Sequence, residues 1–336
     1  MHIKFSTLKE TNPIKSLFIN LLTIAVSLFV AFVLIEVGYR IYFSLNPPLI
    51  VETLTGNRFR PNVNGIYRGG RISTDKHGFR NGIDNHAWDK KKKIMLIGDS
   101  VGFGMGINDE DTISHQLNET FKGADVGFLN LCNPGWDTIQ LRDRLYFHGT
   151  KLGPWKLIVW LYSINDAKLS KIYSPPDYKT LGVLNLPLDT LPNNFFIFRW
   201  PDALRKKIIR SRQLKNKQKD PRRKSWSEYY KWCISTYETG TSTKRNEKVF
   251  VHDVVQWTQQ NDSNILFVIF PAETQFTDKN RIPQDFIKSL GEEFNFPVID
   301  LLPYLSKANK KERIFLKGDH SHLNVKGMKL VLRYSQ

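Results

Sequence analysis

The chain has 336 residues, of which 41% are hydrophobic, 12% aromatic and 24% charged. These proportions are typical of a globular protein and exclude disordered, collagen-like and low-complexity classes. Two cysteines, Cys132 and Cys233, are too few for a disulfide framework and lack the C-x-x-C spacing of zinc or redox sites, so we expect buried thiols. The net charge of +17 would by itself suggest a nucleic-acid partner, but its distribution and the first predicted element argue against one.

That first element is a membrane-spanning helix. The segment from Leu17 to Ile35 contains no charged residue, and about 20 apolar residues of helix cross the hydrocarbon core of a bilayer. A cleaved signal peptide is the alternative, although its apolar region is usually shorter and a small-residue cleavage site should follow it. The sequence therefore predicts an anchor over residues 17–37.

The charges around this span predict its orientation. Lys4, Lys9 and Lys15 precede it, whereas only Arg40 follows within the next twenty residues. Because positive charge accumulates on the cytoplasmic side, residues 1–16 are expected in the cytoplasm and the rest of the chain on the periplasmic or extracellular side. Genomic DNA is then excluded as a partner.

Regular structure is expected to begin near Lys93, after a tether and lead-in segment over residues 38–92. Between Val51 and Trp88 the sequence shows little periodicity, which indicates an irregular segment rather than a separate domain. Further along, short apolar runs typical of buried strands are Ile94 to Ile97, Val126 to Leu131, Leu157 to Leu161, Ile265 to Phe270 and Pro297 to Ile299.

Helical patterns lie between these runs. Apolar residues recur at helical spacing in five groups: Ile113, Leu117 and Phe121; Leu141 and Leu145; Val251, Val254 and Val255; Phe286, Leu290 and Phe294; and, after Asn324 as N-cap, Val325, Met328 and Leu332. The alternation predicts an α/β domain over residues 93–336 with a mostly parallel, five-stranded sheet.

One segment, residues 170–248, interrupts the alternation and is predicted to be an insertion such as a lid. It contains a basic run from Arg199 to Lys224 with twelve Lys and Arg against two Asp, which is ten of the seventeen net positive charges. An aromatic cluster comes just before it: Phe195, Phe196, Phe198 and Trp200. The run is expected either to contact anionic lipid or polysaccharide, or to be a solvated, mobile charge run.

The segment KKIMLIGDSVGFGMG places Ser100 at the end of a predicted strand. Ligands bind at that edge of open α/β sheets, and a following helix start offers N–H groups that stabilise an anion, so the position suits a nucleophile. An ordinary N-cap serine is one alternative. A phosphate-binding loop is another, although Gly102, Gly104 and Gly106 are not followed by the Lys-Ser/Thr pair of a Walker loop.

A serine hydroxyl becomes a nucleophile when a base takes its proton. The C-terminal region offers such a base in His322, with Asp319 three residues before it and just ahead of the last predicted helix. An Asp at this spacing can share a turn with the His and contact its imidazole. Solvent-exposed loop residues without a role are the alternative.

With these residues the chain resembles the SGNH (GDSL) hydrolase family, in which a GDS block near the start and a D-x-x-H block near the end form a triad. The resemblance covers roughly Ser73 to Gly327. It implies a flavodoxin-like three-layer sandwich, with Ser100 as nucleophile, His322 as general base and acid, and Asp319 as the residue that orients His322.

Two more blocks are similar to the oxyanion positions of that family. NLCNPGWDT supplies Gly135 and LYSINDAK supplies Asn165. The resemblance implies that the N–H groups of Ser100 and Gly135 and the Asn165 amide stabilise the oxyanion, and losing one such donor typically costs about 10²- to 10³-fold in rate. The chain departs from the family at Gly102, where relatives often have Thr, and at Ser163, where many have Gly and where a changed acyl pocket is expected.

The lead-in segment RISTDKHGFRN also looks like one in bacterial membrane-anchored members of this family. From its residues we expect a turn at Gly78, a core contact of Phe79 and an ion pair of Arg80, without a catalytic role.

A metallophosphoesterase is the rival interpretation of the polar residues. Asp99, Asp319, His320 and His322 would be its metal ligands, but that chemistry needs several more ligands than the sequence offers.

The sequence thus predicts a membrane-anchored esterase that needs no cofactor or metal. It would cleave an oxygen ester through an acyl-serine intermediate, and O-acyl groups on envelope or secreted glycans are the expected substrates. Acyl transfer to a sugar hydroxyl and non-catalytic glycan binding are the alternatives.

Overall fold

The computed structural model describes residues 13–45, 49–53, 56–83, 85–167, 225–238 and 240–334. The chain divides into two units, which are described separately. The first contains helix α1 (Pro13–Leu45), and the second contains the elements from β1 to α13.

Helix α1 carries the predicted apolar span. Within it, the 25 residues Ile14–Gly38 have a mean hydropathy of 2.7, which is long and apolar enough to cross a membrane, as a signal sequence also can be. Side chains of this helix such as Leu17 and Phe29 are more than half exposed. The expected apolar helix is confirmed.

The second unit is built on a five-stranded sheet in the order β6-β5-β7-β8-β9, with every neighbouring pair parallel. Numbered from the first of these strands, the order is 2-1-3-4-5, which is that of flavodoxin-like folds. All five predicted strands are confirmed: β5 (Lys92–Gly98), β6 (Val126–Asn130), β7 (Leu157–Ser163), β8 (Asn264–Phe270) and β9 (Val298–Asp300).

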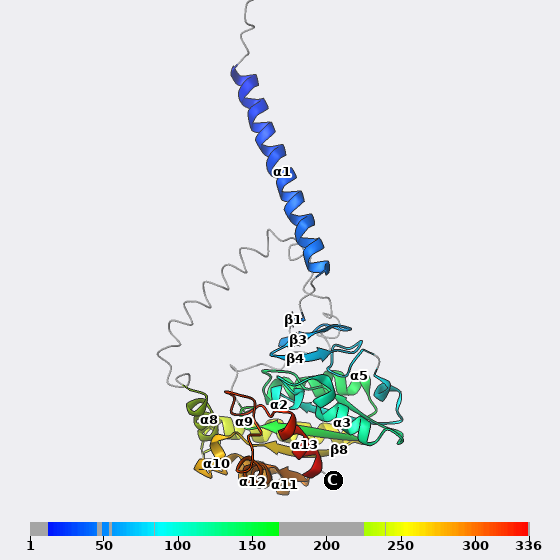
Figure 1. The fold of residues 1–336 in the computed structure, drawn as a ribbon, viewed down its shortest axis with the longest axis vertical. Coiled ribbons are helices and arrows are strands. Elements are labelled where there is room, and N and C mark those ends of the chain that lie inside the picture. The colour runs from blue at the N-terminus through cyan, green and yellow to red at the C-terminus, as the bar shows by residue number, and fades with distance from the viewer. Residues whose placement is uncertain are drawn as a thin grey trace, which may run out of the picture. The chain divides into compact units, whose positions relative to one another are not determined.

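Helices cover both faces of this sheet, which gives three layers (Figure 1). Because successive side chains of a strand point to opposite faces, Met95 and Ile97 of β5 belong to one core and Leu96 to the other. The first core is closed by α4 (Thr138–Arg144), α9 (Ser242–Gln260) and α11 (Ile282–Phe294). The second is closed by α2 (Ser100–Phe103), α3 (Ile113–Thr120), α12 (Leu302–Asn309) and α13 (Val325–Tyr334).

The predicted helices are therefore present, and Asn324 caps α13 as expected because its side chain accepts the N–H of Gly327. Shorter elements complete the unit: 3₁₀ turns η1 (His86–Asp89) and η2 (Asp109–Asp111), a π-helical turn η3 (Leu145–Gly149), α5 (Thr150–Leu152) and α10 (Thr274–Asp278).

The lead-in segment is more regular than its sequence indicated. It forms two antiparallel hairpins, β1 (Ile50–Thr53) with β2 (Gly56–Phe59) and β3 (Asn64–Tyr67) with β4 (Gly70–Ser73). Phe59 and Ile72 are buried in the same core as α2. The expectation of an irregular segment was wrong because strands of four residues with mixed composition are too short to show a clear alternation.

The predicted insertion over residues 170–248 is described only from residue 225 onward. There it forms α8 (Trp226–Ser235) and the beginning of α9. The basic run from Arg199 to Lys224 and the aromatic cluster before it lie outside the described residues.

Candidate active site

Ser100 lies where strand β5 passes into the single-turn helix α2, at the carboxyl edge of the sheet. The N-cap of this helix is Asp99, whose carboxylate accepts the N–H of Val101 at 2.9 Å. Ser100 is therefore not the N-cap residue. As the first residue of the helix, it has an N–H group that is not used in the helix itself.

Ser100, His322 and Asp319 form a continuous line of hydrogen bonds. The Ser100 Oγ is 2.8 Å from Nε2 of His322, although the two residues are 222 positions apart in the chain. Nδ1 of His322 is 2.7 Å from Oδ2 of Asp319. Because a carboxylate only accepts hydrogen bonds, Nδ1 carries the proton and Nε2 faces Ser100 as an acceptor. This tautomer is the one that a general base requires.

The carboxyl group of Asp319 is held in its ionised form. Burial alone would raise its pKa, but the hydrogen bond from the His322 ring and those from the backbone of His322 and Ser321 outweigh burial and hold the pKa well below its usual range. The two backbone N–H groups donate to Oδ1 at 2.9 Å each. Asp319 is thus an anion that fixes the orientation of the ring.

Gly135 and Asn165, the other two predicted site residues, follow the strands on either side of β5. Gly135 has a φ of +79°, which places it in the region that favours glycine, and its N–H has no acceptor among the described residues. Its loop is tied to β5 because Asn133 donates to the carbonyl of Gly98 at 2.9 Å. Asn165 is 9% exposed and comes after β7.

Asp99 connects Asn165 to the nucleophile. Its fully buried carboxylate accepts one N–H of the Asn165 amide at 3.0 Å and makes a longer contact of 3.3 Å with the Ser100 hydroxyl. The amide keeps a second N–H for another acceptor. Ser163 also donates to Asp99, at 2.9 Å, and is 2% exposed. The Ser163 hydroxyl is directed at Asp99, and a changed acyl pocket at this position stays a prediction.

Arg144 of α4 contacts both ends of the loop that carries Gly135. The Arg144 guanidinium lies 4.0 Å from the centre of the Trp136 ring and donates to the carbonyl of Leu131 at 2.8 Å. Burial lowers the pKa of Arg144 to about 9, so the side chain remains charged at neutral pH. The guanidinium thus contacts both Leu131, before the loop, and Trp136, directly after Gly135.

Helix α8 contributes a small apolar cluster beside the site. Tyr230 and Ile234 are buried against Ile164, which precedes Asn165, and against Ala272. The part of the insertion that the structure describes thus supports the β7 loop.

The alternative interpretations of the polar residues find little support in the geometry. His320 is bonded to Glu273 at 2.8 Å, and the residues that the structure describes contain no cluster of three or more His, Cys, Asp or Glu suited to a metal. In the glycine-rich turn, the carbonyl groups of Phe103 and Gly104 accept from Arg80. A phosphate loop would instead present its N–H groups to a ligand.

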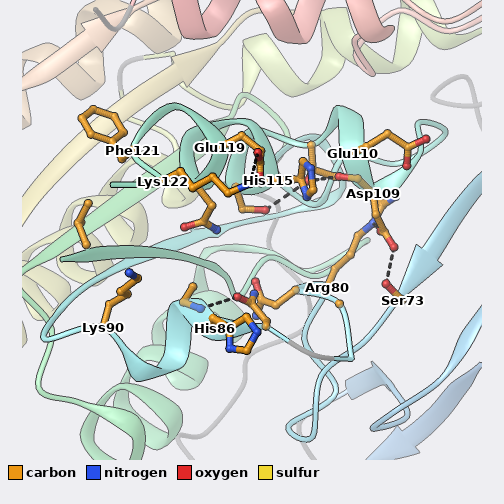
Figure 2. A pocket seen from close by; sticks show the side chains of 18 residues that line it. Ser73, Arg80, His86, Lys90, Asp109, Glu110, His115, Glu119, Phe121 and Lys122 are labelled. Atoms are coloured by element: carbon orange, nitrogen blue, oxygen red, sulfur yellow. Dashed lines mark hydrogen bonds and ion pairs between the residues drawn. The ribbon is translucent and has the colours of Figure 1, made fainter. Parts of the chain in front are cut away.

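A pocket of about 520 Å³ lies apart from these residues, between the lead-in segment and α3 (Figure 2). Figure 2 shows Ser73, Arg80 and Asp109 along one side of it and His115 and Lys122 along another. Ser100, Asp319 and His322 do not line it.

Sequence reasoning missed two features of the site. It considered Asp99 only as a metal ligand of the rival interpretation, although a carboxylate directly before the serine of a GDS block was a visible signal. It also missed the contacts of Arg80 with the turn after Ser100, for which the sequence holds no signal because the acceptors are main-chain carbonyls.

The chain is similar to solved structures that share little sequence with it. No protein-family model matches the chain, and no curated protein matches it either. Among solved structures, TesA is 10% identical with a TM-score of 0.44, over 72% of this chain and 94% of that one. A lipolytic protein of the G-D-S-L family from Veillonella parvula DSM 2008 is 11% identical with a TM-score of 0.43, over 73% and 96%. The acetyl xylan esterase AlAXEase is 16% identical with a TM-score of 0.42, over 72% and 97%.

Proposed function

We propose that this protein is a membrane-anchored serine esterase of the SGNH (GDSL) type, which cleaves an oxygen ester through an acyl-serine intermediate. The observation that carries the proposal is the 2.8 Å separation between Ser100 Oγ and His322 Nε2, with Asp319 2.7 Å from the other ring nitrogen. Residues so distant in sequence meet in the order nucleophile, base and orienting acid, which is the arrangement that activates a serine.

In the first half of the reaction, the Ser100 oxygen attacks the acyl carbon while Nε2 of His322 takes its proton. The ionised Asp319 stabilises the resulting imidazolium. When the tetrahedral intermediate collapses, the bond to the alcohol oxygen breaks and His322 gives its proton to the leaving alcohol. Water then attacks the acyl-serine with His322 again as base, which releases the acid and restores the hydroxyl.

The oxyanion of each intermediate would be stabilised by the N–H groups of Ser100 and Gly135 and by the Asn165 amide. These roles are supported by the N–H of Gly135, which has no acceptor in the part of the chain that the structure describes, and by the anchoring of Asn165 on Asp99. Donors that are fixed before the reaction cost no reorganisation when the charge develops.

Helix α1 would hold this domain on the periplasmic or extracellular side, with residues 1–16 in the cytoplasm. In that location the expected esters are small O-acyl groups on envelope or secreted glycans. The basic run from Arg199 to Lys224 suits an anionic lipid or polysaccharide at the same surface.

The proposal is tested by labelling the full chain, in detergent, with a fluorophosphonate and by measuring hydrolysis of acetyl to long-chain esters. Label should attach to Ser100 and vanish in Ser100→Ala, whereas Ser289→Ala, which removes a hydroxyl bonded only within α11, should label normally. Label on another residue, or none, would refute the assignment of Ser100.

Two further variants test the roles of the other residues. Asp319→Asn should lower kcat by about 10⁴-fold because the amide favours the wrong tautomer of His322, and Asn165→Ala by about 10²- to 10³-fold. Assays with candidate glycans decide between water and a sugar hydroxyl as acceptor: acylated glycan with little free acid would show a transferase instead.

A further inference from the structure

Arg80 of the lead-in segment is a buried cation whose entire hydrogen-bonding capacity is used. Its side chain is 1% exposed. Nε donates to Asp109 at 2.7 Å, and the four N–H bonds of the terminal nitrogens go to four main-chain carbonyls: Phe103 at 3.0 Å, Gly104 at 2.6 Å, Arg71 at 2.8 Å and Ile107 at 2.7 Å. A guanidinium has five N–H donors, so none remains unpaired.

Three of these carbonyls belong to the turn that begins at Ser100. Helix α2 is a single turn with Ser100 at its first position and Phe103 at its last, and Arg80 binds the carbonyls at its carboxyl end. The guanidinium also lies over the Phe103 ring, 5.0 Å from its centre. A cation at this end of a helix satisfies carbonyls that have no partner within the helix.

The same turn is bonded back to Ser100 itself. The N–H groups of Gly104 and Met105 both point to the Ser100 carbonyl, the latter at 3.0 Å. A helix of four residues has few internal hydrogen bonds, so its shape depends on its surroundings. Arg80 is the charged group that bonds to the carboxyl end of this turn.

The next residue of the lead-in segment, Asn81, makes a parallel connection. Its side-chain oxygen accepts the N–H of Asn130 at 2.6 Å, at the end of β6. Asn130 in turn donates to the carbonyl of Gly102 at 3.2 Å and accepts the N–H of Cys132 at 3.0 Å. Arg80 and Asn81 thus reach both the turn that carries Ser100 and the start of the loop that carries Gly135.

We propose that Arg80 is a positioning residue for the reaction: it clamps the turn from Ser100 to Ile107 and thereby fixes the Ser100 hydroxyl and N–H relative to His322. The inference rests on the proposed esterase function. It assigns the lead-in segment a part in the active site, although no atom of Arg80 contacts the reacting groups.

Two substitutions test the clamp. Arg80→Lys keeps the charge but offers one nitrogen in place of a planar fork, and Arg80→Gln removes the charge as well. We expect both to lower kcat by about 10- to 100-fold with little change in KM, since a displacement of about 1 Å at a nucleophile has an effect of this size. Fluorophosphonate labelling of Ser100 should slow in the same proportion.

Two controls separate positioning from a general loss of stability. Lys122→Gln removes an exposed ion pair with Glu119, neither residue being part of the clamp, and should leave kcat unchanged. Ile72→Ala opens a cavity under the β3–β4 hairpin, so it should destabilise the fold but retain kcat at temperatures where the protein stays folded. If Ile72→Ala lowers kcat as much as Arg80→Lys at equal stability, the specific role of Arg80 is refuted.

Amide hydrogen exchange on the full chain in detergent gives a readout that does not depend on activity. Peptides covering residues 99–107 should exchange faster in Arg80→Lys and as in the wild type in Lys122→Gln. Unchanged exchange in Arg80→Lys overturns the inference even if the protein is an esterase, and so does faster exchange with an unchanged kcat. A wild-type chain that neither hydrolyses esters nor labels at Ser100 overturns the proposed function, and the positioning role with it.

Discussion

Glu247 of α9 is a buried carboxyl group at the end of a hydrogen-bonded chain that leads to the active site. It is 2% exposed and 2.8 Å from the Tyr162 hydroxyl, which is 2.7 Å from the Tyr237 hydroxyl, which donates to the carbonyl of Ile164. The Tyr162 hydroxyl donates to the Glu247 carboxyl group, and the Tyr237 hydroxyl lies between Tyr162 and the Ile164 carbonyl.

Burial dominates the pKa of Glu247. Burial raises it from 4.5 to about 7, although the hydrogen bonds from Thr138 and Tyr162 act in the opposite direction. The neutral form therefore dominates below pH 7 in the folded protein. Since Ile164 precedes Asn165, these hydrogen bonds also support the loop that carries Asn165.

Because this pKa is raised, Glu247 should make stability fall as pH rises. Below pH 4.5 the Glu247 carboxyl group is protonated in both the folded and the unfolded state. Between pH 4.5 and about 7 the unfolded chain loses the proton and the folded protein keeps it. The free energy of unfolding therefore falls over this range, by about 3 kcal/mol in all. Glu247→Gln keeps a neutral side chain at every pH. We expect its free energy of unfolding, measured with denaturant, to change between pH 5 and pH 8 by correspondingly less than that of the wild type. The exposed control Glu293→Gln should follow the wild type, and equal pH dependence in all three proteins would contradict the prediction.

At the scale of elements, helix α2 can lie close to the sheet only because it contains Gly102. A Cβ atom at that position would be 2.7 Å from Sγ of Cys132 and 3.0 Å from Cδ1 of Leu161. Cys132, the first buried thiol expected from the sequence, fills the space beside the helix. This explains why the chain has Gly where the family that it resembles often has Thr.

This packing predicts an effect of Gly102→Ala on both stability and activity. The added methyl group must displace α2 or its neighbours, which typically costs about 1 to 3 kcal/mol, and the displaced helix carries Ser100. Cys132→Ala removes the nearer neighbour, so the double variant should lose less stability than the sum of the two single variants in denaturant unfolding. Gly123→Ala is the matched control, since a Cβ there meets no atom within 4 Å. Simple additivity would show that the contact with Cys132 does not limit the position of α2.

The strands and hairpins illustrate which elements could be predicted from the sequence and which could not. The strands of the sheet were found because buried parallel strands are continuous apolar runs, as in Ile94 to Ile97. Ser100 and His322 were expected at one edge of the sheet because Ser100 follows a strand and His322 lies in the loop before the last helix. The hairpins gave no such signal, and Ile66 of β3 is even 72% exposed. The ion pair of Arg80 was predicted and is present with Asp109, but its bonds to carbonyl groups were not predicted because they depend on tertiary approach of the main chain.

At the scale of the whole molecule, charge and hydropathy are separated along the chain. The apolar residues outside the folded cores are concentrated in α1, and the strongest concentration of positive charge is the run from Arg199 to Lys224, outside the described residues. The proposed topology places the lysines before α1 in the cytoplasm and the second unit on the other side of the membrane. That orientation can be measured because the two native cysteines, Cys132 and Cys233, are each only 2% exposed and give little background labelling.

We predict that a cysteine introduced at Gly123, in the exposed loop after α3, reacts with a membrane-impermeant maleimide in intact bacterial spheroplasts. A cysteine at Ser6, on the predicted cytoplasmic side, should react only after the membrane is permeabilised, because the positive-inside bias of Lys4, Lys9 and Lys15 retains it there. The unsubstituted chain is the control for both.

Carbonate washing should leave the full-length protein in the membrane, since nothing short of detergent removes a spanning helix. Labelling of the two cysteines in the reverse pattern would contradict the orientation. An intact mass that lacks the residues up to the end of α1 would identify the helix as a cleaved signal sequence, and the esterase would then be a released protein instead of an anchored one.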